Sequence, residues 1–309
     1  MAEPTQPPLI AIVGPTASGK TDLALALAPR LPLEIVVADS RQVYRGMDVG
    51  TAKPDAAART AVPHHLLDLV DPDEPFSVAG WIERARALIP QVAARGRLPL
   101  VVGGTGLYVS ALVDGHDYAS QPWSPEIRAR LADELAVDGR EPLAERLRDA
   151  EPGTAVDLRN PRRVLRALER LEGGGAAPGA APYAGRVIML ALDRPRELLY
   201  RRIDRRTEWM FRDGGLLGEV HRLLDAGYGA ELRPMTGHGY REAVAHLAGE
   251  WSLERAIEVT ARHTRQYAKR QLSWFRRDAR IMWLRAGDRP ADDPDLVDEA
   301  DRLIRAALS

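Results

Sequence analysis

One octet, GPTASGKT at residues 14–21, constrains this 309-residue chain more than any other stretch. It directly follows the apolar run 9–13 and precedes a helix-forming stretch at 22–28. The G-x-x-x-x-G-K-T spacing between a strand and a helix is typical of a P-loop. In such a loop, successive backbone N–H groups and the positive end of a helix dipole hold phosphate groups. A plain glycine-rich turn is the alternative, but the full pattern in this context favours binding of a phosphorylated ligand.

Several residues of the octet have a separate role in that interpretation. Gly14 and Gly19 allow backbone angles and close approach that a Cβ would block. Lys20 brings a compact ammonium to the terminal phosphates, and the Thr21 hydroxyl is placed to hold Mg²⁺. Thr21 is therefore the predicted metal ligand, and the predicted phosphate-binding residues are Gly14, Pro15, Thr16, Ala17, Ser18, Gly19, Lys20 and Thr21.

Composition is that of a soluble globular protein, with 45% hydrophobic and 28% charged residues. The chain has no cysteine, which excludes disulfides and thiolate metal sites. Its first residues lack the basic and apolar regions of a signal peptide, and no apolar run approaches the length of a membrane span. We therefore expect a cytoplasmic monomer without membrane contact.

Two further apolar runs end in polar turns. Asp39 to Gln42 follow the run 33–38, and Gly-Gly-Thr, ending at Thr105, follows the run 98–102. Because the carboxyl ends of parallel strands share one edge of a sheet, both turns should lie beside the P-loop. The second of these runs does not end in the aspartate that P-loop NTPases use for Mg²⁺, which disfavours a plain ATPase. Asp39 is the nearest strand-end acid. Asp193 is a second candidate, with a helix-entry role as the alternative.

The order of elements predicts an α/β fold. Apolar runs alternate with helical periods, as expected for a P-loop NTPase-like, three-layer core around a parallel sheet. We expect the first part of the core at 1–115, a helical insertion at 116–185, and core completion with C-terminal helices at 186–309. The insertion shows no strand and ends in the low-complexity linker 173–182. Its predicted helices are 124–137, 141–150 and 161–171.

The stretch 199–206 carries four arginines, and Arg202 and Arg206 share one helical face at i, i+4. They form either a solvated face with Asp204 and Glu208 as partners, or a clamp that closes over the P-loop phosphates. The spacing leaves both possibilities open.

A net charge of −1 hides a basic segment at 262–280, where the only acid is Asp278. Tyr267, Trp274 and Phe275 are interleaved with its cations, a mixture used to bind phosphate backbones and stack bases. A merely solvated helix is the alternative. Lysine occurs only at positions 20, 53 and 269, which flags the last two as possible site residues.

Together these motifs resemble the tRNA dimethylallyltransferases, also called tRNA isopentenyltransferases. The resemblance spans nearly the whole chain, and all three lysines fall inside it. One departure is His238, where the family usually has an aliphatic residue. The motifs are GPTASGKT (14–21), DSRQVYRGMDVGTAKP (39–54), HHLLD (64–68), VGGTGLY (102–108), NPRRVLRALE (160–169), GYRE (239–242) and YAKRQLSWFR (267–276).

The resemblance implies a reaction. A dimethylallyl group moves from dimethylallyl diphosphate to the exocyclic amine of the adenosine 3′ of the anticodon, in tRNAs that read codons beginning with U. The P-loop would hold the diphosphate with Mg²⁺ as cofactor. Asp39 would act as the base and Thr105 would donate to the bridging oxygen, while Lys20 and Arg202 or Arg206 would neutralise the leaving group.

The resemblance also implies which residues meet tRNA. They lie in the turn after residue 38, in the insertion, and in the loop before residue 242. The expected contacts with the anticodon stem-loop are Asp39, Ser40, Arg41, Gln42, Thr105, Arg128, Pro161, Arg162, Arg163, Val164, Leu165, Thr236, Gly237, His238, Gly239, Tyr240 and Arg241.

Three other functions fit part of the pattern. A nucleotide or small-molecule kinase would bind ATP at the P-loop, but it leaves the basic, aromatic segment unexplained. An adenylate isopentenyltransferase would use free AMP or ATP, and it would not need the insertion or the basic segment. A nucleotide-gated RNA-binding module would not need Asp39 and Thr105 beside a phosphate site.

Overall fold

The computed structural model describes residues 6–115, 124–175 and 181–309. The chain divides into two compact units, one formed by Met1–Val113 with Pro182–Ser309 and the other by Asp114–Ala181. The stretch 116–123, at the start of the predicted insertion, lies outside the described residues, as do residues 176–180 of the predicted linker.

The first unit is built on a six-stranded sheet in the order β3-β2-β4-β1-β5-β6. Every strand pair is parallel, which confirms the predicted α/β fold. β1 carries the P-loop at its carboxyl end and lies between β4 and β5. The strands are β1 (Leu9–Val13), β2 (Leu33–Val37), β3 (His64–His65), β4 (Leu98–Gly103), β5 (Val187–Asp193) and β6 (Ile281–Arg285).

β6 corrects the expectation that the chain is helical after residue 192. Its five residues, IMWLR, directly follow the basic segment and carry no alternating pattern that would mark a strand. Pairing with β5, in the register Met189 to Ile281, supplies the order that the local sequence lacks. Tertiary context therefore decides this element.

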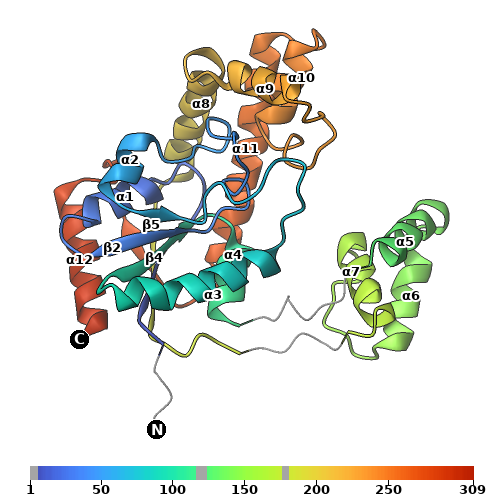
Figure 1. The fold of residues 1–309 in the computed structure, drawn as a ribbon, viewed down its shortest axis with the longest axis horizontal. Helices are drawn as coiled ribbons and strands as arrows, with labels where there is room; N and C mark the ends of the chain where they lie inside the picture. The colour runs from blue at the N-terminus through green and yellow to red at the C-terminus, as the bar shows by residue number, and fades with distance from the viewer. Residues whose placement is uncertain (1–5, 116–123, 176–180) are drawn as a thin grey trace. The chain divides into compact units, whose positions relative to one another are not determined.

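Helices cover both faces of the sheet (Figure 1). α1 (Lys20–Leu27) and α12 (Pro294–Leu308) pack together on one face, where Ile12, Leu27 and Ile304 are fully buried. α3 (Val78–Ala94) and α4 (Gly106–Val113) cover the other face. These layers confirm the predicted three-layer core.

A group of helices stands beside the carboxyl edge of the sheet. α11 (Leu253–Phe275) packs against α8 (Arg196–Arg212), α10 (Tyr240–Leu247) and α4, while α9 (Leu216–Asp225) packs against α8 and α10. The short α2 (Ala56–Ala61) follows the loop after β2. These helices bring residues from the second half of the chain to the strand ends.

In its described residues, 124–175 and the ends of the unit beside them, the second unit is a bundle of three helices, α5 (Pro125–Asp138), α6 (Arg140–Ala150) and α7 (Pro161–Glu172). Each begins and ends within a residue or two of its predicted bounds. Leu131, Leu147 and Val164 form the centre of its core. Across the described residues of both units, no helix combines the length and the apolar character needed to cross a membrane.

Candidate active site

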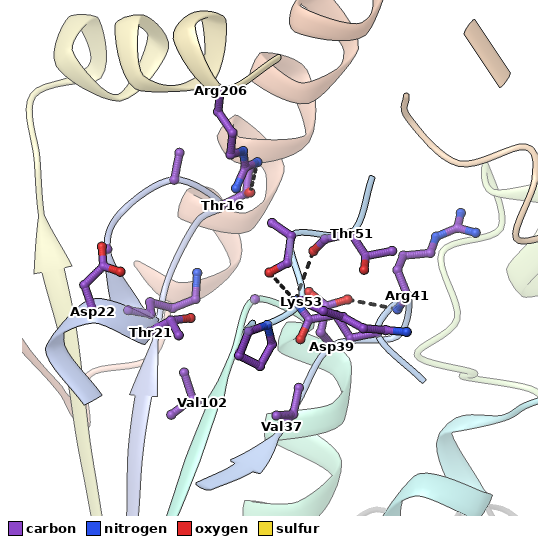
Figure 2. Close-up of a pocket in the computed structure, with 18 of the residues that line it drawn as sticks. Thr16, Thr21, Asp22, Val37, Asp39, Arg41, Thr51, Lys53, Val102 and Arg206 are labelled. Atoms are coloured by element: carbon purple, nitrogen blue, oxygen red, sulfur yellow. Dashed lines mark hydrogen bonds between the residues drawn. The ribbon is translucent and has the colours of Figure 1, made fainter. Parts of the chain in front are cut away.

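A cavity of about 1020 Å³ opens at the carboxyl edge of the sheet. The P-loop and α1 form one half, which we call the diphosphate half. The turn after β2, the loop at 50–55 and the loop at 237–240 form the other, which we call the acceptor half (Figure 2). α8 and α11 contribute to the wall.

The P-loop backbone is held in an unusual conformation. Gly19 has φ of 99°, and Ala17 has φ of 63°, which side-chain-bearing residues rarely adopt. A Cβ at Gly19 would also lie 2.7 Å from the Ala291 Cβ. Only glycine fits at position 19, and α1 begins directly after it, so its first N–H groups face the cavity.

Lys20 is partly buried at this loop, and its Nζ donates to the Pro15 carbonyl at 2.8 Å. Burial lowers the pKa of Lys20 to about 8, against the attraction of the Asp39 carboxylate. An incoming anion would restore the charge that burial disfavours.

Arg202 and Arg206 both reach the P-loop from α8. Arg202 Nε donates to the Ala17 carbonyl at 2.8 Å, and Arg206 Nη2 donates to Thr16 Oγ1 at 2.6 Å (Figure 2). Their alternative partners are engaged elsewhere, since Asp204 pairs with Arg265 and Glu208 with Arg212. This geometry is that of a clamp and not of a solvated face, while direct contact with a diphosphate stays a prediction.

The two predicted catalytic residues lie on neighbouring turns. The Ser40 N–H donates to Thr105 Oγ1 at 3.0 Å, which ties the turn after β2 to the turn after β4. Asp39 Oδ1 accepts from the Arg41 N–H at 2.9 Å, and in the described chain its second oxygen has no hydrogen-bond donor. That oxygen is therefore available to a ligand. Asp193, the other candidate acid, is not among the residues that line the cavity.

Tyr267 lies against this pair. Burial and the nearby carboxylate of Asp39 raise the pKa of Tyr267 to about 12, against its hydrogen bond with Thr105. The phenol therefore stays protonated at neutral pH, and it adds a polar group to the wall without a second negative charge.

Gln271 is a site residue that the sequence interpretation missed. Its Oε1 accepts from the Thr16 N–H and its Nε2 donates to the Gly104 carbonyl, both at 2.8 Å. The side chain thereby joins the P-loop to the turn that holds Thr105. One helical turn after Tyr267, it is a polar residue on the buried face of a charged helix, which is the signal that could have found it.

Glu219 organises the acceptor half, and it was also missed. Its buried carboxylate accepts from the backbone N–H groups of Asp48, Val49 and Gly50 at 2.9, 2.8 and 3.3 Å. It also accepts from the Tyr240 hydroxyl at 2.6 Å. One carboxylate thus fixes the loop after β2 against α10.

Lys53 serves the same loop. Its Nζ donates to the Tyr44 carbonyl at 2.6 Å and to carboxylate oxygens of Asp48 and Asp68 at 2.8 and 2.5 Å. Burial alone would raise the pKa of Asp68, but hydrogen bonds from Lys53 and Arg59 hold it below its usual value. Lys53 lines the cavity with its ammonium fully engaged, so its role there is to shape the loop.

The loop at 236–241, predicted to meet tRNA, presents only part of itself to the cavity. Gly237, His238 and Tyr240 line it, but the Tyr240 side chain is buried. His238 is exposed at the rim, with its ring centroid 5.9 Å from that of Tyr267. Thr236 and Arg241 lie outside the lining.

The basic segment is only partly an open surface. Phe275 is buried, Tyr267 faces the cavity, and only Trp274 among its aromatic residues is largely exposed, at 41%. Lys269 is exposed as well, away from the cavity lining.

In the second unit, the predicted tRNA contacts cluster at the start of α7. Asn160 caps this helix and accepts from the N–H groups of Arg162 and Arg163 at 3.1 and 3.4 Å, and both arginine side chains are exposed. Val164 instead packs into the core, and Arg128 pairs with Glu169 at 2.9 Å. All these assignments to tRNA stay predictions.

The chain is similar to known proteins along most of its length. A family profile described as "IPP transferase" matches residues 42–278, and one described as "Isopentenyl transferase" matches residues 7–63. The chain belongs to the IPP transferase family. A tRNA dimethylallyltransferase of Syntrophobacter fumaroxidans is 46% identical, with 91% of this chain and 84% of the relative covered. One from a Roseiflexus species is also 46% identical, over 96% and 98%.

Solved structures of the same family share the fold. A tRNA isopentenylpyrophosphate transferase of Bacillus halodurans has a TM-score of 0.73 and 39% identity, covering 97% of this chain and 96% of that one. A eukaryotic dimethylallyltransferase described as acting on tRNA has a TM-score of 0.78 and 25% identity, over 95% and 77%. The chain therefore shares its fold with known tRNA isopentenyltransferases along nearly its whole length.

Proposed function

We propose that this chain transfers a dimethylallyl group from dimethylallyl diphosphate to the exocyclic amine of the adenosine 3′ of the anticodon in tRNAs that read codons beginning with U. One observation carries the proposal. Asp39 lines the same cavity as a P-loop with three cations, Lys20, Arg202 and Arg206. Thr105 lies on the adjacent turn, directly after the lining residue Gly104, and its Oγ1 accepts from the N–H of Ser40. Two relatives are named tRNA dimethylallyltransferase, which supports transfer of a dimethylallyl group to tRNA.

The geometry gives each group a part in the transfer. The amine nitrogen attacks C1 of the dimethylallyl group, and the bond from C1 to the bridging oxygen breaks. The free oxygen of Asp39 takes the proton that the amine loses. The Thr105 hydroxyl accepts from the Ser40 N–H and donates to Ser40 Oγ over a long 3.5 Å. In the proposed reaction it turns its hydrogen to the bridging oxygen instead. Diphosphate then leaves with its charge matched by Lys20 and the two arginines.

Mg²⁺ fits the residues present. The Thr21 hydroxyl, Asp22 and Asp39 line the cavity, and oxygen donors of this kind suit a hard divalent cation. Among the described residues no group of three acidic or histidine side chains could hold a metal without a ligand. Thr21 would therefore hold Mg²⁺ together with oxygens of the diphosphate. When bound, Mg²⁺ supplies neutralisation of charge on the leaving group.

The acceptor half suits a base drawn out of an RNA loop. An anticodon-loop adenosine must leave its stack before its amine can meet C1. The turn 39–42, with Arg41 anchored to the Arg233 carbonyl at 3.0 Å, forms one wall for that base. A single chain supplies the P-loop, the acid and this wall, which supports action as a monomer.

The test is a transfer assay with radiolabelled dimethylallyl diphosphate, Mg²⁺ and unmodified tRNA, run beside AMP and ATP. Label is expected in tRNA alone. Asp39→Ala is expected to lower the transfer rate by about 10²–10⁴-fold, because general-base catalysis contributes that much. Asp204→Ala, which removes an acid of α8 that pairs with Arg265 and lies outside the cavity lining, is the matched control and should keep the rate.

Other outcomes separate the alternatives. Label in AMP or ATP would identify a free-nucleotide transferase and contradict the tRNA assignment. Full activity of a folded Asp39→Ala protein would remove the proposed base. Activity that survives complete removal of Mg²⁺ by chelator would contradict the metal dependence.

A further inference from the structure

Behind the P-loop lies a buried cation that the proposed reaction does not use. Arg194 follows β5, and only 5% of its surface is exposed. It does not line the cavity, whereas Gly19, on the other side of the loop, does. A guanidinium in such a place needs a physical reason, because burying a charge is costly unless it is paired.

Carbonyl groups hold Arg194. Its Nε donates to the Ser18 carbonyl at 2.7 Å, and its Nη1 donates to the carbonyls of Gly287 and Arg289 at 2.9 and 2.7 Å. Within the described chain no carboxylate pairs with it, and its Nη2 has no hydrogen-bond partner. Nη2 lies 3.5 Å from the point where a Cβ of Gly19 would sit. The carboxylates of Asp22 and Asp288 attract this charge without forming an ion pair with it, so the guanidinium remains a cation directly under the loop.

The bond to Ser18 has a consequence on the cavity side. The carbonyl of Ser18 and the N–H of Gly19 belong to one planar, trans peptide, so they point in opposite directions. Holding that carbonyl outward turns the Gly19 N–H toward the cavity. Arg202 holds the preceding carbonyl, that of Ala17, while the Ser18 N–H of the same peptide donates to the Pro15 carbonyl at 3.3 Å. The strained stretch Ala17–Gly19 thus has a cation on each of two successive carbonyls.

We infer that Arg194 is a positioning residue for the diphosphate: it fixes the Ser18–Gly19 peptide so that the Gly19 N–H faces the bound anion, and it adds positive potential from behind the loop. This inference rests on the proposed function, because it takes the P-loop ligand to be a diphosphate. Its effect is confined to the diphosphate half, since the contacts of Arg194 are with the P-loop and with the loop 287–289.

The experiment compares wild type with Arg194→Met and Arg194→Lys, titrated with inorganic diphosphate in a calorimeter. Arg194→Met loses both the charge and the bridge, so its Kd is expected to rise about tenfold or more, as for a lost charge-assisted hydrogen bond. Arg194→Lys keeps the charge, but an ammonium lacks the planar fork that spans these carbonyls, so it should also bind more weakly. The control is Arg201→Met on the exposed face of α8.

A second readout separates positioning from general support of the fold. In steady-state assays, the KM for dimethylallyl diphosphate should rise in both variants while the KM for tRNA stays unchanged. Folded variants that bind diphosphate like wild type would overturn the inference, and so would equal losses for both substrates. Failure of the wild-type protein to bind diphosphate would instead overturn the proposed function itself.

Discussion

The two halves of the cavity are built in opposite ways. The diphosphate half is built around one contiguous octet, and Arg202 and Arg194, from outside it, donate to its carbonyls. The acceptor half is assembled from segments far apart in the chain, which Glu219 and Lys53 hold together. In the diphosphate half, Arg194 and Arg202 hold the strained P-loop. In the acceptor half, the buried carboxylate of Glu219 orders the loop after β2.

The difference matters for the chemistry. The proposed ligand of the first half, a diphosphate, is small and highly charged, so a fixed set of N–H groups and cations would suffice to hold it. The acceptor belongs to a polymer and must be oriented by a wall, and the loop at 48–53 supplies part of that wall. We therefore expect changes in the two halves to affect the two substrates separately.

Glu219→Gln should have the largest effect, because it disrupts the hydrogen bonds that hold the acceptor half together. The amide would place an NH₂ group against donors, leaving buried N–H or hydroxyl groups without an acceptor. We expect a loss of about 2–4 kcal/mol in the free energy of unfolding, measured by urea denaturation. The KM for tRNA should rise, while the Kd for dimethylallyl diphosphate stays at the wild-type value.

Two variants make this prediction specific. Tyr240→Phe removes a single donor from Glu219 and should cost about 1 kcal/mol. Glu208→Gln, which loses only an exposed ion pair with Arg212, should change the free energy of unfolding by less than about 1 kcal/mol. Equal weakening of diphosphate and tRNA binding in Glu219→Gln would show that the two halves are not independent.

The pH dependence of diphosphate binding tests the role of the Lys20 charge in the diphosphate half. The pKa of Lys20 lies near 8 in the ligand-free protein, and an anion favours its charged form. Affinity should therefore be highest below pH 8 and fall as the pH rises above it, by up to about tenfold per pH unit until the raised pKa of the complex is reached. Binding of dimethylallyl diphosphate measured from pH 7 to 9.5 tests this.

Lys20→Arg provides the control, because its guanidinium does not titrate in that range. This variant should give a nearly flat profile between pH 7 and 9.5. A wild-type profile that is equally flat would contradict the role of Lys20 charge in binding.

The sequence predicted the parts of the site that are local in the chain, and it missed the links between distant segments. The octet is local, and its pattern predicted the P-loop and the helix that follows it. The apolar runs 33–38 and 98–102 predicted the turns at Asp39 and Thr105 beside the P-loop. The links that complete the site join residues far apart in sequence. They are 255 residues apart for Thr16 and Gln271, 176 for Ser18 and Arg194, and 170 for Val49 and Glu219. No local periodicity encodes such pairs.

The remaining error has the same origin. β6 becomes a strand because β5 offers it an edge, not because IMWLR favours one. The three helices of the second unit were predicted closely, since an N-cap residue and a helical period mark each start or face within a few residues, as Ser124 and Asn160 do. Local signals thus predict individual helices and turns, whereas contacts between distant residues determine strand β6 and the links within the site.

The smallest expected effect concerns tRNA binding by the second unit. Arg163 is exposed at the start of α7, and Arg163→Ala should weaken binding of an anticodon stem-loop about fivefold, or about 1 kcal/mol, by removing one phosphate contact. The slope of log affinity against log salt should fall by about 1. Arg159→Ala, an equally exposed arginine of the same unit that pairs with Asp157, is the matched control and should leave both quantities unchanged. Diphosphate binding should be the same in all three proteins. If Arg163→Ala binds the stem-loop with the wild-type affinity and salt slope, Arg163 at the start of α7 does not contact tRNA. Recognition would then depend on the acceptor half and the basic segment.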